Sequence, residues 1–177
     1  MIHSSAIVPE PENIGEGTKI WHFSHIRAGA KIGKACTIGQ NVYVAANVSV
    51  GDRSKIQNNV SLFDGVRLME DVFIGPSVVF TNVKRPRAHI EQKASFLPTH
   101  IGKGVTIGAN ATVICGIQIG EFAFIGAGSL VTQSLPPYVM ALGSPAKIVG
   151  YVCKCAYDLH PGERCQQCAL NYEDVAP

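Results

Sequence analysis

The chain is organised by an aliphatic or aromatic residue that returns at every sixth position. The first series is Ile2, Val8, Ile14, Ile20, Ile26, Ile32, Ile38, Val44, Val50, Ile56, Leu62, Leu68, Ile74 and Phe80. After a break, a second series in a new phase is Ile101, Ile107, Val113, Ile119, Ile125 and Val131. A period of six fits neither an α-helix, with a period of 3.6, nor an ordinary strand, with a period of 2. It is typical of a hexapeptide β-helix, in which each repeat gives one flat face and one core residue.

Two flanking positions sharpen this prediction. The residue two places before the repeated position is small or β-branched, as in Thr18, Ser24 and Cys36, which suits a crowded corner. The residue just after it is often glycine, as in Gly33 and Gly75, and we expect these glycines to supply the backbone angles of a tight turn. Three hexads close one triangular coil of 18 residues, and coils stack at the ~4.8 Å spacing of paired strands. The twenty repeated positions therefore predict an all-β, parallel β-helix of six to seven coils.

The break in the period predicts a loop thrown out of the coils. Phe80 and Ile101 are 21 positions apart, which is not a multiple of six, and residues 81–100 are strongly polar. Pro86 and Pro98, with the apolar Ile90 and Phe96, favour an ordered loop over a tether. Long loops on rigid scaffolds are usually either functional or disordered, so we expect this one to take part in function.

Several motifs then resemble a known family. They are IWHFSHIRAGAKIG (residues 20–33), IGQNVYV (38–44), KIQNNVSLFDGV (55–66), GPSVVFTNVKRPRAHIEQK (75–93) and GSPAK (143–147). Together they are similar to the left-handed β-helix acyltransferases, and among these to the bacterial nucleotide-sugar N-acetyltransferases that act on UDP-2-acetamido-3-amino-2,3-dideoxyglucuronate. The resemblance spans roughly residues 1–150. It implies a left-handed coil, acetyl-CoA as co-substrate, and a homotrimer with active sites between subunits.

The expected organisation has three parts. Residues 1–135 form the β-helix, residues 136–150 form a closing segment, and residues 151–177 form a cysteine-rich tail.

The resemblance also implies a coenzyme A groove along the later coils. Small residues at the turns would leave room for the pantetheine arm, and Lys147 would lie near the adenosine or its phosphates. The small residues are Gly108, Ala109, Gly126 and Ala127.

For the amino sugar, Asn82 is the expected catalytic residue. In the family an asparagine at this point of the motif contacts the substrate amine, and an amide orients an amine without acting as a base near neutral pH. Further expected substrate-binding residues are His22, Tyr43, Asn58, Asp64, Arg87 and Lys93. A histidine base is the rival mechanism. Its candidates are His22, His25, His89 and His100.

The tail holds four of the six cysteines, as Cys153-x-Cys155 and Cys165-x-x-Cys168. Two close pairs separated by a short loop fit a tetrahedral, structural Zn²⁺ site; His160 is a less favoured ligand. Two disulfides are the alternative, which the lack of a secretion signal disfavours. The other two cysteines, Cys36 and Cys115, are expected to pack in the core.

Composition narrows the functional classes. Of the 177 residues 46% are hydrophobic and 16% charged, and a formal net charge of +2 argues against a broad nucleic-acid surface. No run approaches the roughly 18 apolar residues of a membrane span, and the first residues, MIHSSAIVPE, do not read as a signal peptide. We therefore expect a cytoplasmic protein without a nucleic-acid or membrane partner.

Three alternatives stay open at this point. An O-acetyltransferase or an enzyme for another amino sugar would share the scaffold, because fold does not fix substrate. A γ-type carbonic anhydrase would need three well-spaced histidines on the coil walls. A non-enzymatic repeat scaffold would use its zinc tail to bind a partner.

Overall fold

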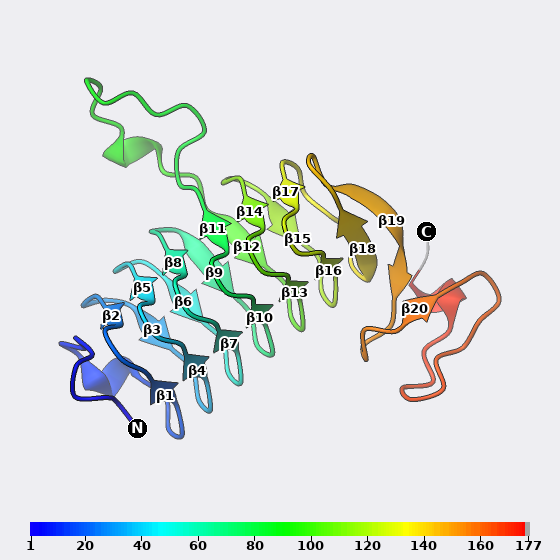
Figure 1. The fold of residues 1–177 in the computed structure, drawn as a ribbon, viewed down its shortest axis with the longest axis horizontal. Helices are drawn as coiled ribbons and strands as arrows, with labels where there is room; N and C mark the ends of the chain where they lie inside the picture. Colours follow the sequence, from blue (N-terminus) through cyan, green and yellow to red (C-terminus); the bar gives the residue numbers. More distant parts are fainter. Residues whose placement is uncertain (176–177) are drawn as a thin grey trace.

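A computed structural model, which describes residues 1–175, confirms the predicted fold class: the chain is a left-handed parallel β-helix of about seven turns. Very short strands repeat around a triangular prism, and from β1 to β14 each strand pairs with the one three places later in the chain. The three parallel sheets, which we call A, B and C, are the faces of this prism (Figure 1).

Sheet A is the longest face and continues past the coils into the tail. Its strands, in spatial order, are β1 (Lys19–Ile20), β4 (Thr37–Ile38), β7 (Lys55–Ile56), β10 (Phe73–Ile74), β13 (Thr106–Ile107), β16 (Phe124–Ile125), β18 (Val139–Leu142), β19 (Lys147–Val152) and β20 (Asp158–Leu159). The strands up to β18 are parallel, whereas β19 and β20 are antiparallel.

Sheets B and C complete the prism. Sheet B consists of β2 (His25–Ile26), β5 (Tyr43–Val44), β8 (Ser61–Leu62), β11 (Val79–Phe80), β14 (Thr112–Val113) and β17 (Leu130–Val131). Sheet C consists of β3 (Lys31–Ile32), β6 (Ser49–Val50), β9 (Val66–Leu68), β12 (Thr99–Ile101) and β15 (Gln118–Ile119). The 3-10 turns are η1 (Pro11–Asn13), η2 (Lys93–Ser95) and η3 (Tyr172–Asp174).

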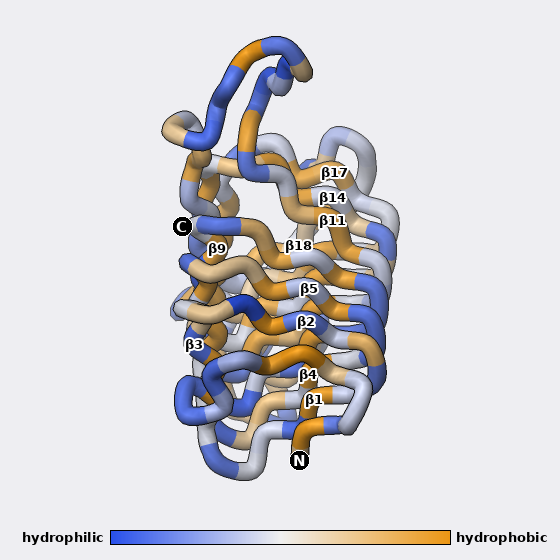
Figure 2. The backbone as a smooth tube through the Cα atoms, turned by 90° about the vertical axis from the view of Figure 1, so that its left-hand side faces the viewer, coloured by the Kyte–Doolittle hydropathy of each residue, from blue (hydrophilic) through white to orange (hydrophobic). Residues whose placement is uncertain are grey.

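The residues of the hexad series form the core from the second coil onward. Ile20, Ile38 and Ile56 stack one above the other in sheet A and are fully buried. The small residues two places earlier are buried as well, with Ser24 donating its hydroxyl to the Gly39 carbonyl (2.7 Å). The result is one continuous apolar column along the inside of the prism. Figure 2 shows hydrophobic positions recurring along the backbone from coil to coil.

The expected role of the glycines after the hexad position was wrong. Gly33 and Gly75 are outside the left-handed region, which is occupied two residues further on, for example by Asn59 (φ 62°) and Ser77 (φ 58°). Glycine is needed after the hexad position because neighbouring coils approach closely there. A Cβ on Gly75 would lie 2.6 Å from the backbone nitrogen of Ala109 in the next coil.

The polar loop leaves the coils between β11 and β12 (Figure 1). In an ordinary coil Lys19 pairs with Thr37, 18 residues later, whereas Val79 pairs with Thr112, 33 residues later. The loop therefore adds 15 residues to one coil. We expected it to end at residue 100, but Thr99 and His100 already belong to β12, because Thr99 pairs with Val66.

The closing segment and the tail follow the last coil. β18 completes a parallel rung on β16, and the chain then reverses into the β18–β19 hairpin. The tail packs around a small second cluster of Cys153, Leu159 and Cys165. The last two residues of the expected tail, Ala176 and Pro177, lie outside the described residues. Within residues 1–175, no helix has the length and apolar character that crossing a bilayer requires.

Candidate active site

Most of the expected binding residues lie on sheet B or at its two edges, whereas Arg87 and Lys93 lie in the loop. We call the edge between sheets A and B the AB corner; it carries the turns that follow β1, β4, β7, β10, β13 and β16. The edge between sheets B and C is the BC corner, and it carries the turns that follow β2, β5, β8, β11, β14 and β17.

The AB corner collects the residues expected to bind coenzyme A. The amide of Gly75 donates to the Ile107 carbonyl and that of Gly108 donates to the Ile125 carbonyl, both at 2.8 Å, so Gly108 and Gly126 follow one another up this corner. Beside them Ala109 and Ala127 add only methyl groups, and the Leu142 side chain covers the space next to Gly126. The upper half of the corner is therefore a narrow track with few side chains to obstruct a bound chain.

Lys147 lies at the upper end of this same track. It is the first residue of β19 and pairs with Leu142, whose side chain occupies the space next to Gly126. The exposed Lys147 ammonium is thus placed beyond the last glycine of the track, where it could meet the charged end of a long ligand.

Further down, the AB corner becomes polar and aromatic. A groove of about 350 Å³ opens there, lined by Trp21, His22, Gly39, Gln40, Gln57 and Asn58. Sequence reasoning singled out His22 and Asn58 but missed Trp21, Gln40 and Gln57. The available signal was that these residues interrupt the run of small residues at the turns.

Asn82 and Asp64 lie on adjacent coils at the BC corner. The Asn82 carbonyl accepts a hydrogen bond from the Leu97 amide (3.0 Å), which closes the base of the loop. The Thr81 hydroxyl accepts from the Cys115 amide (2.9 Å) and fixes the residue before Asn82 to the next coil. The structure therefore holds the half-buried Asn82 on a rigid base.

Asn58 and Asp64 each use one oxygen to fix the coil below. The side-chain oxygen of Asn58 accepts from the Gln40 amide (2.8 Å), and Asp64 accepts from the Asn47 amide (3.1 Å). These bonds satisfy turn amides and orient both side chains, so each retains one further polar atom that a ligand could meet.

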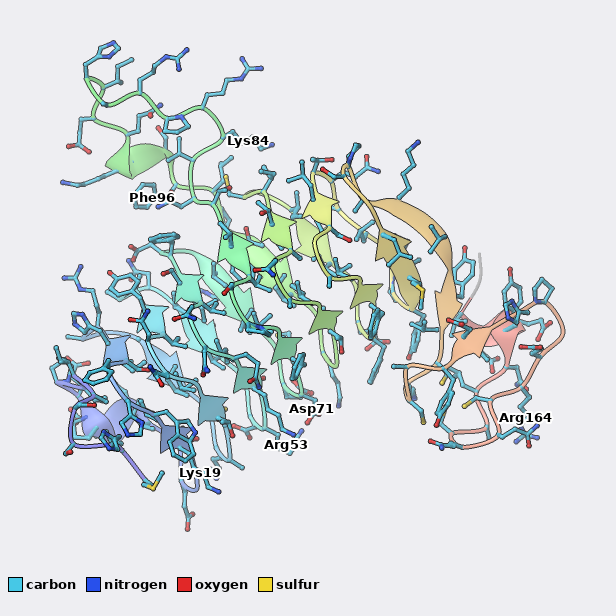
Figure 3. The ribbon with its side chains drawn as sticks, in the orientation of Figure 1. Lys19, Arg53, Asp71, Lys84, Phe96 and Arg164 are labelled. Atoms are coloured by element: carbon cyan, nitrogen blue, oxygen red, sulfur yellow. The ribbon has the colours of Figure 1, made fainter. Side chains whose placement is uncertain are left out.

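Arg87 and Lys93 lie in the outer part of the loop and are exposed. Lys93 pairs with Glu91 at 3.7 Å, with both side chains largely in solvent. The Arg87 amide donates to the Gln92 side chain (3.2 Å), which shapes the loop from within. In Figures 1 and 2 the loop projects away from the coils of its own chain, and Figure 3 shows Lys84 near its base.

Tyr43 and the candidate histidines are spread over the molecule. Tyr43 is half-buried on sheet B, between His25 (ring centroids 5.7 Å apart) and Phe63 (6.2 Å). The His22 ring packs against that of His3 at the AB corner, with centroids 3.6 Å apart and the ring planes tilted by 33°. His89 is exposed in the loop, and His100 lies on sheet C. The histidines do not form one cluster within residues 1–175, where the four tail cysteines are the one group suited to a metal.

The four tail cysteines do come together. Their sulfur atoms all lie within 4.8 Å of one another, and His160 is not part of the group. Backbone N–H groups of Cys168 and Gln167 lower the pKa of Cys165 to about 6. Desolvation, followed by the neighbouring Cys168 thiol, raises the pKa of Cys155 to about 12. The cluster therefore offers four sulfur ligands. Because four thiolates this close together would repel one another, a bound cation is needed for all four to be deprotonated.

Comparison with known proteins places this architecture in a family. Residues 13–46, 29–64 and 98–133 match the bacterial transferase hexapeptide repeat. The chain is 40% identical over 174 residues to the dTDP-3-amino-3,6-dideoxy-alpha-D-galactopyranose 3-N-acetyltransferase of Aneurinibacillus thermoaerophilus. This alignment covers 97% of this chain and 90% of that protein. It is also 30% identical over 126 residues to the galactoside O-acetyltransferase of Escherichia coli, covering 64% of this chain and 62% of that one.

Solved structures share the same fold. The GDP-perosamine N-acetyltransferase of Caulobacter crescentus, solved with CoA and GDP-perosamine, matches with a TM-score of 0.62 and 24% identity; 84% of this chain aligns with 55% of that one. The acetyltransferase domain of PglB from Neisseria gonorrhoeae, solved with acetyl coenzyme A, matches with a TM-score of 0.59 and 19% identity, over 84% of this chain and 56% of that one.

The fold and the repeat define a hexapeptide-repeat transferase. By its long alignment with the Aneurinibacillus enzyme, this chain belongs to the family of hexapeptide-repeat nucleotide-sugar N-acetyltransferases.

Proposed function

We propose that this protein transfers the acetyl group of acetyl-CoA to the 3-amino group of a nucleoside-diphosphate-linked amino sugar. The observation that carries the proposal is the loop base, which holds Asn82 rigidly at the BC corner, in a chain 40% identical to a 3-N-acetyltransferase along 97% of its length. As acceptor we propose UDP-2-acetamido-3-amino-2,3-dideoxyglucuronate, because the exposed cations Arg87 and Lys93 of the same loop suit its carboxylate.

The relative supports a second acceptor. A dTDP-linked 3-amino-3,6-dideoxyhexose has a methyl group in place of the carboxylate, and the Aneurinibacillus enzyme is named for such a sugar. A comparison of the two acceptors with wild type and Arg87→Ala decides between them. Preference for the glucuronate that disappears in Arg87→Ala supports the first acceptor, whereas turnover of the dideoxyhexose alone supports the second.

The proposed reaction needs no strong general acid or base from the protein. The neutral amine attacks the thioester carbonyl, the new C–N bond forms, and the C–S bond breaks as the tetrahedral intermediate collapses. The departing thiolate of coenzyme A takes the proton that the nitrogen releases, directly or through water. In this scheme Asn82 orients the amine, and most of the rate comes from the proximity of the two reactants.

The test follows thiol release from acetyl-CoA in wild type and in Asn82→Ala. Loss of the positioning amide should lower kcat/KM for the amino sugar by about a hundredfold. Asn13→Ala, which changes a half-buried asparagine on the first coil, away from the loop, serves as the matched control and should retain activity. Full activity of Asn82→Ala, with a pH profile that flattens on changing one of the candidate histidines, would favour the histidine mechanism instead.

We propose further that the enzyme is a homotrimer with its active sites between subunits. In one chain, Asn82 and the coenzyme track with Lys147 lie at opposite edges of sheet B, and the loop reaches away from its own coils. Ile90, near the loop tip, is 50% exposed in the single chain, and contact with a neighbouring subunit would bury it.

Complementation tests this arrangement. The Asn82→Ala and Lys147→Ala variants should each have low activity alone. In a mixed trimer, however, some sites would combine the intact Asn82 of one chain with the intact Lys147 of another. Recovery of activity on mixing under subunit exchange supports sites shared between chains. A mass equal to one chain of 18.9 kDa, or no recovery in exchanged trimers, contradicts it.

We propose that the four tail cysteines hold one structural Zn²⁺. With Zn–S bonds of about 2.3 Å, a tetrahedral site brings its sulfurs within about 4 Å of one another, close to the spacing of this cluster. Four thiolates leave no open position, so the metal would support the fold and leave acetyl transfer to the coils. The six cysteines are all unpaired, which fits a reducing compartment such as the cytoplasm.

A further inference from the structure

The groove beside Trp21 is a feature that acetyl transfer itself does not require. It lies at the AB corner, on the coils below the glycine track, and its lining contains an indole and three side-chain amides. With the exception of His22, the lining residues carry no titratable side chain. Such a surface suits a flat, neutral, polar group better than a phosphate or a carboxylate.

The coil register builds a slot in this groove. The amides of Trp21, Gly39 and Gln57 donate to Ile38, Ile56 and Ile74, so these three residues occupy equivalent places on successive coils. Trp21 and Gln57 are therefore two coil spacings apart, about 9.6 Å along the axis. Gly39 puts no side chain of its own between them, and all three residues line the groove.

The polar atoms of the slot are oriented and available. The Asn58 oxygen accepts from the Gln40 amide at 2.8 Å and would lie 2.6 Å from a Cβ on Gly39, so the Asn58 amide forms the floor of the slot. Among residues 1–175, the side-chain amides of Gln40 and Gln57 make no hydrogen bond. An amide places a donor beside an acceptor, which complements the hydrogen-bonding edge of a nucleobase.

We infer that this groove binds the nucleobase of the sugar nucleotide, with the ring stacked on Trp21 and its edge on Gln57 and Gln40. The inference rests on the proposed function, because that function requires a nucleoside diphosphate. Coenzyme A also carries a base, but the track expected to bind coenzyme A lies on the β13 and β16 coils, two or more coils above Gln57. The sugar nucleotide would then lie on the lower coils and coenzyme A on the upper ones.

Trp21 provides a direct probe, since it is the one tryptophan in the chain. The full-length protein is titrated with UMP, dTMP, GMP and 3′-phospho-AMP while tryptophan fluorescence is recorded. Saturable quenching by one of the first three nucleotides is expected, and the one that binds most tightly identifies the base. Quenching by 3′-phospho-AMP alone, or by none of the four, would overturn the inference.

Substitutions then separate the base subsite from the rest of the site. Gln57→Ala should weaken nucleotide binding by about tenfold, as expected for one lost hydrogen-bonded pair. Gln133→Ala, which changes an exposed glutamine on a distant turn, should leave binding unchanged. Equal affinities for the two variants would contradict an edge contact from Gln57.

Kinetics provide a second readout. Trp21→Ala should raise KM for the sugar nucleotide by roughly 5- to 100-fold, the range for loss of base stacking, with KM for acetyl-CoA unchanged. Trp21→Phe keeps a ring and should recover most of the affinity. A protein that binds a nucleotide at Trp21 but turns over no amino sugar would refute the proposed function and leave the subsite intact. An unchanged KM in a folded Trp21→Ala variant would refute the subsite alone.

Discussion

The stacked coils and the cysteine tail are stabilised in different ways. Each coil hydrogen-bonds to the coil above and below and adds residues such as Ile38 and Ile56 to one continuous apolar column. The described part of the tail, about 25 residues long, buries three residues, Cys153, Leu159 and Cys165, and other side chains of the tail pack against them only partly buried. A repeat spreads its stability over many equivalent interfaces, whereas a short tail needs a local crosslink or metal to offset the entropy of ordering.

Removal of the proposed zinc should give the largest difference between the two regions. Binding of a structural zinc contributes on the order of 10 kcal/mol to the folding of a small site, so a chelator or Cys165→Ser should unfold the tail and leave the coils intact. Limited proteolysis should then cut after Gly150, while the β-sheet circular dichroism of the coils persists. Cys115→Ala, which removes a buried thiol from the coils, is the control and should keep one metal per chain. A tail that resists proteolysis equally well without metal would contradict this prediction.

A glycine substitution tests how tightly neighbouring coils pack against each other. In Gly75→Ala the new Cβ meets the Ala109 backbone at 2.6 Å, and because that backbone belongs to a coil held on both sides, the cost should be about 1–3 kcal/mol. Gly150→Ala, at the end of the closing hairpin, is the matched control because its Cβ meets no atom within 4 Å. The free energy of unfolding in urea measures both. Equal values for the two variants would show that the coils adjust freely to one another.

The smallest expected effect concerns an ion pair on the coil surface. Arg53 donates from Nε and a terminal nitrogen to the two oxygens of Asp71 on the next coil, at 2.6 and 2.8 Å (Figure 3). This contact lowers the pKa of Asp71. The stability that it gives is present above the ordinary pKa of an aspartate and is lost as the pH falls through the lowered value.

Since the pair is exposed, Asp71→Asn should lower Tm near neutral pH by no more than about 3 °C. The difference from wild type should shrink as the pH falls below the lowered pKa of Asp71. Asp158→Asn, at an exposed aspartate of the tail without an ion pair, is the control. A Tm difference between wild type and Asp71→Asn that persists in acid would mean that Asp71 acts through packing.

The coil core and the break could be predicted from the sequence because a single residue per hexad points inward. The role of the glycines could not. Periodicity shows that a small residue recurs after Ile32 or Ile74, but not whether the backbone turns there or another coil approaches there. The stack places the left-handed residue two positions later, where Arg53 and Phe23 occupy it as readily as glycine does.

The candidate site was predictable only in part, because some of its residues come together only when the coils stack. Motifs resembling the family indicated Asn82, Lys147 and the glycine track. The groove was missed because Trp21, Gln40 and Gln57 belong to three different coils and each, taken alone, resembles an ordinary turn residue. Only stacking at an 18-residue offset makes them neighbours.

The sequence by itself therefore determined the solenoid, the position of its extruded loop and the four-cysteine tail, because each depends on local spacing along the chain. The tertiary structure decided which corner carries each polar side chain, how closely the coils approach, and that Asn82 and the track of Gly108 and Gly126 lie at opposite edges of one sheet. These properties depend on the register between coils, where residues 18 positions apart in the chain come into contact.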